Sequence, residues 1–132
     1  MKTSLFIFAL LFSGSLLAAT DHYVLRDGNH VHHLKITKLN DEYNVSMDVD
    51  FEPNADEKNA KACSAEIAGE AKSSGENKIT LKKRSEEEAN FCTLDITLSA
   101  TGAKVEQSKD CDNFLSSICH FTSEGKEIPK VK

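Results

Sequence analysis

The side chains best suited to chemistry in this chain are histidines near its amino-terminal end, at His22, His30, His32 and His33. Imidazole nitrogens bind zinc and copper. If Asp27-Gly28 forms a two-residue hairpin turn, residue 22 lies opposite residue 33. His22 and His33 then share one face of the hairpin with Asp21 nearby, which predicts a metal site. The alternative is a set of exposed strand histidines, because two imidazoles without a third fixed ligand bind metal weakly.

The second group with chemical potential is four cysteines, Cys63, Cys92, Cys111 and Cys119. They contain no C-x-x-C pair of the kind found in zinc sites, so we expect two disulfides, for which three pairings exist. We favour Cys63–Cys92, because both residues begin strands that face the core, and Cys111–Cys119, which brackets a compact segment. The rival pairing is Cys92–Cys111, since a reversal at Thr101-Gly102 brings residue 92 near residue 109.

Two acid-rich loops are candidates for binding a partner. The first holds Asp56 and Glu57, and the second runs from basic residues into Glu86, Glu87 and Glu88. The chain has 21 Asp and Glu against 16 Lys and Arg, a formal net charge of −5. Such a surface attracts a cationic protein partner and disfavours nucleic acid. The alternative is that these loops are simply solvated.

The spacing of nucleophiles and acids does not predict an enzyme. No Ser lies in a G-x-S-x-G motif, and the pair Asp48 and Asp50 is expected on the solvent face of a strand. A half-buried sheet of this size leaves little room for the deep cleft that a carboxylate pair would need. We therefore expect a binding protein with no catalytic residues and no cofactor.

The first nineteen residues indicate the compartment. Lys2 precedes an uncharged apolar run over 5–12, and the segment ends on the small residues Ala18 and Ala19. This is the build of a secretory signal peptide, and the run is shorter than the roughly 20 residues that span a bilayer. We expect cleavage after Ala18 or Ala19 and a periplasmic or secreted domain over 20–132 with no membrane attachment. Disulfides form in that compartment.

The segments that must position these side chains are predicted to be short strands. Apolar and polar residues alternate over 43–51 and over 92–98, and His32 alternates in the same way with Leu34 and Ile36. Period two with one apolar face predicts half-buried strands, and turn residues separate the runs at intervals of about ten residues. We expect an all-β domain: a small antiparallel barrel or sandwich of seven to eight strands, stapled by disulfides.

This layout resembles small bacterial exported β-proteins of the C-type lysozyme inhibitor kind. The shared elements are Leu-x-Ile-x-x-Leu at 34–39, Glu-Tyr-Asn-Val-Ser at 42–46, Cys63 with Ile67-x-Gly69, Cys92-x-Leu94-x-Ile96, and the pair Cys111 and Cys119. The resemblance implies an eight-stranded antiparallel barrel and a loop that plugs the active-site cleft of a lysozyme. That family's Ser-Gly-rich loop leads into an aromatic residue, which Ser73-Ser74-Gly75-Glu76 lacks, so we transfer no inhibitory residue.

These observations favour a periplasmic binding protein whose partner is a cationic lysozyme or other cell-wall hydrolase. It would act as an inhibitor, or as an immunity protein against such a toxin. One alternative is a periplasmic metal-binding protein that uses His22 and His33. Another is an interaction module with no inhibitory role.

Overall fold

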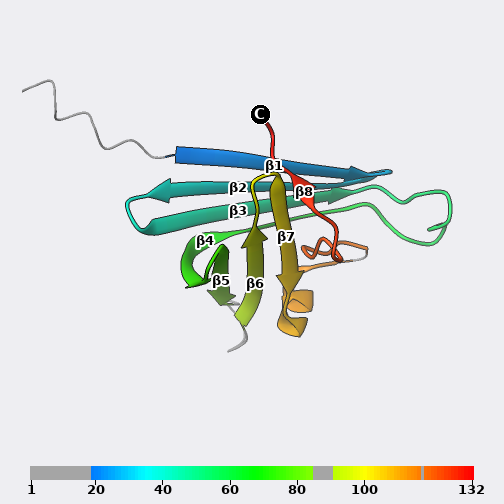
Figure 1. Ribbon diagram of the computed structural model, residues 1–132. Coiled ribbons are helices and arrows are strands. Elements are labelled where there is room, and N and C mark those ends of the chain that lie inside the picture. Colours follow the sequence, from blue (N-terminus) through cyan, green and yellow to red (C-terminus); the bar gives the residue numbers. More distant parts are fainter. Residues whose placement is uncertain (1–18, 85–90, 117) are drawn as a thin grey trace, which may run out of the picture.

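The computed structural model describes residues 19–84, 91–116 and 118–132, and these form an all-β domain (Figure 1). Eight strands stand in the sheet in the order of the sequence, each antiparallel to its neighbour. A 3-10 helix, η3 (Lys109–Phe114), lies between the last two strands. The strands are β1 (Ala19–Asp27), β2 (His30–Leu39), β3 (Glu42–Phe51), β4 (Cys63–Gly75), β5 (Lys78–Arg84), β6 (Phe91–Leu98), β7 (Gly102–Gln107) and β8 (Ile128–Pro129).

The sheet curls into a nearly closed barrel because the end of the chain returns to β1. Tyr23 forms a bridge with Lys130, just after β8, and the amide of Val131 donates to the carbonyl of His22 at 2.7 Å. The Lys130 ammonium also lies 3.5 Å from the Asp21 carboxylate. The prediction of an all-β domain, either a small antiparallel barrel or a sandwich of seven to eight strands, is therefore confirmed, and the architecture is a nearly closed barrel of eight strands.

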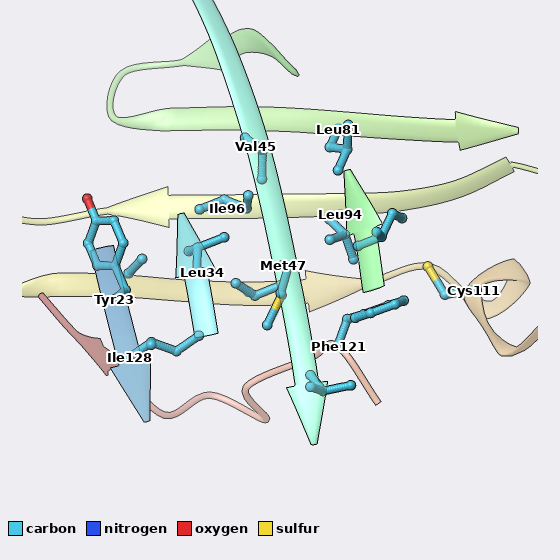
Figure 2. Close-up of a cluster of buried hydrophobic side chains, with 14 of the residues drawn as sticks. Tyr23, Leu34, Val45, Met47, Leu81, Leu94, Ile96, Cys111, Phe121 and Ile128 are labelled. Carbon is cyan, nitrogen blue, oxygen red and sulfur yellow. The ribbon is translucent and has the colours of Figure 1, made fainter. Parts of the chain in front are cut away.

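Alternation along the strands builds the core. In β3, Val45, Met47, Val49 and Phe51 are buried, while the acidic residues between them are exposed. Figure 2 shows Val45 and Met47 in one cluster with side chains from the other strands and from the C-terminal segment. Burying a side chain of this size contributes about 1.5–3 kcal/mol, so this strand alone accounts for a substantial part of the hydrophobic stabilisation.

The first hairpin has a different register from the one predicted. Asp27 pairs with His30, so the turn is Gly28-Asn29 rather than Asp27-Gly28. Gly28 takes a φ of +62°, in the left-handed region that glycine adopts without strain. The pairing therefore moves by two residues, and a shift of two leaves each side chain on its original face. His22 and His33 still share a face, but as diagonal neighbours.

All four cysteines are bonded, but the favoured pairing is wrong. The bonds are Cys63–Cys119 and Cys92–Cys111, so only the rival pairing is confirmed. Cys111 reaches Cys92 because η3 lies against β6. The amide of Ser108, which precedes η3, donates to the carbonyl of Thr93 at 2.8 Å.

The position of Cys63 in the sheet excludes the favoured bond to Cys92. β4 pairs with β5 only from Ala71 onward, and Cys63 lies eight residues earlier, about 26 Å along the strand. β5 also separates β4 from β6. A disulfide needs Cα atoms about 4.4–6.8 Å apart. Cys63 instead bonds to Cys119, in the chain between η3 and β8, and this leaves Cys111 for Cys92.

Candidate functional site

A cleft of about 510 Å³ opens at one end of the barrel. Three segments line it: the β1–β2 hairpin, the loop after β3, and residues 118–126, which we call the strap. Its titratable lining residues are the histidines His30, His32 and His120, the acids Asp27, Asp56, Glu57 and Glu124, and the base Lys126. We call the four acids the acidic mouth. Segments far apart in the sequence thus meet at one concave surface.

Asn54 fixes the loop after β3 against the hairpin. Its side-chain oxygen accepts a hydrogen bond from the amide of Asn29 at 3.1 Å, and the amide of Glu52 donates to the carbonyl of Asn29 at 3.0 Å. The amide of Asn54 donates to the Glu57 carboxylate at 2.9 Å. The Glu57 amide in turn donates to the Asn54 carbonyl at 2.9 Å. This closed turn holds the Glu57 side chain at the cleft.

Glu57 forms the best-defined polar contact of the cleft. Its carboxylate lies 2.9 Å from Nε2 of His30, whose ring stacks on Phe51 with centroids 4.3 Å apart. The hydrogen bond from the Asn54 amide, followed by the contact with His30, holds the pKa of Glu57 below its usual value. The cleft therefore carries a fixed negative charge beside an aromatic stack.

The strap is fastened to the barrel by a disulfide and by hydrogen bonds. Cys119 bonds to Cys63 at the start of β4. The side-chain oxygen of Gln107, at the end of β7, accepts from the amides of Phe121 and Thr122 at 2.7 and 3.0 Å. Phe121 is fully buried in the core, where Figure 2 shows it beside strand side chains. These anchors place His120 at the cleft and the Thr122 carbonyl against the rings of His32 and His120.

The Thr122 carbonyl fixes the tautomers of two histidines. It lies 3.1 Å from Nε2 of His32 and 2.8 Å from Nδ1 of His120. A carbonyl only accepts hydrogen bonds, so both of these nitrogens carry hydrogen. In the neutral imidazoles, Nδ1 of His32 and Nε2 of His120 are therefore left as acceptors.

His32 is an unusual interior residue, only 3% exposed. Burial, reinforced by the neighbouring His120, lowers its pKa to about 4, so the ring is neutral at pH 7. Its Nδ1 is buried and has no hydrogen-bond partner in the described part of the chain. An unsatisfied buried acceptor costs about 1–3 kcal/mol. Such a group marks a place where a bound donor would restore a hydrogen bond.

The charges at the cleft are mostly negative. Lys126 pairs with Asp27, and this hydrogen bond lowers the pKa of Asp27. The Glu124 carboxylate lies 3.5 Å from Nε2 of His120. Asp56 is exposed at the rim. His32 is neutral, and the lining residues include four carboxylates but a single lysine. The acidic mouth therefore favours the binding of a cation.

The predicted partner-binding residues have different outcomes. Asp56 and Glu57 both line the cleft, although the sequence only indicated an acid-rich loop. The second loop, with Glu86, Glu87 and Glu88, lies outside the described residues. Its role therefore stays a prediction.

The predicted metal pair is in contact but incomplete. Nδ1 of His22 lies 3.3 Å from Nε2 of His33, and Nδ1 of His33 lies 4.0 Å from the Asp48 carboxylate. Asp21, expected nearby, lies on the opposite face, where it pairs with Lys130. Over residues 19–84, 91–116 and 118–132, no group of three His, Cys, Asp or Glu side chains is placed to hold a metal.

Two residues of the cleft, His32 and His120, were not predicted as site residues from the sequence. His32 lies on the same inward face of β2 as Leu34 and Ile36. A histidine on an apolar strand face was the sequence signal that could have indicated a site in the interior. His120 gave no such indication, because the strap has no regular alternation. Around Phe51, the rings of His30, His32 and His120 lie at centroid distances of 4.3, 5.1 and 4.9 Å.

Comparisons of the chain with protein-family models, with curated proteins and with solved structures found no match. Within the described segments, no helix has the length and apolar character needed to cross a membrane.

Proposed function

We propose that this chain is an extracytoplasmic binding protein that inhibits a cationic cell-wall hydrolase, such as a lysozyme, through the acidic mouth. The observation that carries the proposal is the convergence of Asp27, Asp56, Glu57 and Glu124 on one cleft. Complementary charge accelerates the encounter with a basic partner and fixes its orientation. An immunity protein against a hydrolytic toxin would use the same surface.

The construction of the mouth suits recognition without catalysis. Asn54 holds the loop after β3 against the β1–β2 hairpin, and the Cys63–Cys119 disulfide and Gln107 hold the strap against the barrel. A rigid binding surface loses less conformational entropy when the partner docks. The two disulfides are also consistent with an oxidising compartment outside the cytoplasm.

The test is inhibition of bacterial cell lysis, followed by turbidity, with purified lysozymes of several classes and pull-down of each enzyme. We expect inhibition of at least one basic lysozyme. The double variant Asp56→Asn/Glu57→Gln should weaken it by roughly tenfold, because each change removes a charge and keeps a hydrogen-bond acceptor. The matched control is Glu66→Gln/Glu70→Gln, two exposed acids on the outer face of β4, which should inhibit like the wild type.

Absence of both inhibition and binding with every lysozyme class would refute the lysozyme proposal. Binding without inhibition would instead favour an interaction module. Equal weakening by the two double variants would show that overall charge, rather than the acidic mouth, carries recognition.

Metal binding at His22 and His33 remains a second candidate. Their facing nitrogens are 3.3 Å apart, which matches roughly the edge of a tetrahedron around zinc with Zn–N bonds of about 2.05 Å. Calorimetry with zinc and with copper tests it. Unchanged affinity in His22→Ala/His33→Ala would remove this site.

A further inference from the structure

The cleft contains acceptors without matching donors. Nδ1 of His32 is buried and unpaired within the described residues. Nε2 of His120 and the Glu124 carboxylate, which both line the cleft, lie 3.5 Å apart. A cationic group with N–H donors, placed between His32 Nδ1 and His120 Nε2, would give a hydrogen bond to each nitrogen. The buried imidazole nitrogen calls for a hydrogen-bond donor, and the carboxylates of the acidic mouth favour a donor that is positively charged.

The walls of the cleft favour a planar cation over a compact one. The ring of His30 and the apolar side chains of Leu25 and Ile118 line the cleft, and the buried Phe51 supports the His30 ring from behind. A guanidinium is planar, weakly hydrated and able to stack on aromatic rings, and its five N–H groups point in several directions. A lysine ammonium is a compact and strongly hydrated charge, so it would gain less from the aromatic and apolar walls.

We propose that the cleft receives one arginine side chain of the partner, with its guanidinium bonded to His32 Nδ1, His120 Nε2 and the carboxylates of Glu57 and Glu124. The proposal rests on the proposed function, since it names the group that the acidic mouth recognises. Because His32 Nδ1 is buried, side chains packed around it must shift to admit the donor. The rings of His32 and His120 lie 5.3 Å apart, so this shift is directly measurable at both.

The test uses three blocked tripeptides with the full folded protein: acetyl-Gly-Arg-Gly-amide, its lysine analogue and its citrulline analogue. Citrulline has nearly the shape of arginine without the charge. Histidine ring resonances are followed by two-dimensional NMR during titration. We expect saturable shifts of His32 and His120 with the arginine peptide, and binding at least about tenfold weaker with citrulline, because the charge-assisted hydrogen bonds are lost. His22, on the outer face, should not move.

Two results would overturn the proposal. One is equal binding of the arginine and citrulline peptides, and the other is equal binding of arginine and lysine. Glu57→Gln should weaken the arginine peptide several-fold, and His32→Phe should abolish the shift of His120. Glu66→Gln/Glu70→Gln is the control. If His32→Phe fails to fold, Glu57→Gln still decides, since glutamine preserves the hydrogen bond from Asn54.

The outcome is separable from that of the proposed function. Lysozyme inhibition without arginine-peptide binding refutes the arginine site and leaves the inhibitor proposal standing. Arginine-peptide binding without inhibition of any lysozyme supports the arginine site and refutes the lysozyme proposal.

Discussion

Among single residues, His32 links the core to the cleft. It takes a position in β2 where alternation places apolar side chains, and it remains neutral there because burial lowers its pKa to about 4. In the unfolded chain a histidine has a pKa of about 6.5. Below pH 6.5, His32 is mostly protonated in the unfolded chain, whereas in the folded protein it becomes protonated only near pH 4. Stability contributed by neutral His32 is thus present above pH 6.5 and is lost as the pH falls towards 4.

We predict that the free energy of unfolding falls by about 2 kcal/mol between pH 7 and pH 4.5 because of His32 alone, after allowance for partial screening by solvent. Urea denaturation at a series of pH values measures this. His32→Phe should flatten the curve over that interval, whatever its stability at pH 7.

Two carboxyls at the cleft, those of Asp27 and Glu57, do not imitate this result. The carboxyls of Asp27 and Glu57 have lowered pKa values, so they lose their stabilising charge at more acid pH, and they do so in both proteins. Identical slopes for wild type and His32→Phe would contradict the assignment of a depressed pKa to His32.

Among the elements, the strap depends on one disulfide more than on the other. Cys63–Cys119 closes a separation of 56 residues, and Cys92–Cys111 one of 19. The chain-entropy relation gives about 4 kcal/mol for the longer loop and about 3 kcal/mol for the shorter. Only the first bond holds the segment that carries His120. Its loss should therefore affect stability and the cleft together.

We predict that Cys63→Ala/Cys119→Ala lowers the free energy of unfolding by about 4 kcal/mol and brings the ring signals of His32 and His120 towards those of free histidine. Cys92→Ala/Cys111→Ala should lower it by about 3 kcal/mol and leave the two ring signals near their native positions. Denaturation and histidine NMR measure both effects. Retention of the native His120 signal in the first variant would show that Gln107 alone secures the strap.

The elements also show which features a sequence can predict. Alternation is local, so it predicts the strands over 43–51 and 92–98, and the number and spacing of the strands indicate a barrel or a sandwich. The turn of the first hairpin depends on the backbone of Gly28 and on the hydrogen bond from the Asn29 amide to Asn54, which lies far away in sequence. The disulfide partners depend on which strands are neighbours in the closed sheet. Neither is encoded in a short window of residues.

The candidate site was predicted only in part for the same reason. Asp56 and Glu57 could be singled out because acids in a polar loop are evident in the sequence. The cleft itself requires the hairpin, that loop and the strap to meet, and the strap has no repeating pattern. His120 is brought beside His32 by contacts with β7 and by the bond to β4.

For the whole molecule, the net charge of −5 and the acidic mouth act together on a basic partner. Long-range attraction affects the rate of encounter, and salt screens it over about 10 Å at 0.1 M. We predict that the association rate constant with a basic lysozyme falls on the order of tenfold from about 0.01 M to 0.15 M salt, with little change in the dissociation rate. Stopped-flow or surface-based kinetics at several salt concentrations measures both rates.

The position of the charges decides how variants alter this salt dependence. Asp56→Asn/Glu57→Gln and Glu66→Gln/Glu70→Gln each remove two negative charges, so they change the net charge equally. If the partner docks at the acidic mouth, the first variant should slow association more at low salt and flatten its salt dependence, because those charges face the approaching cation at short range. Equal effects of the two variants would mean that attraction comes from net charge alone and that the cleft does not orient the encounter.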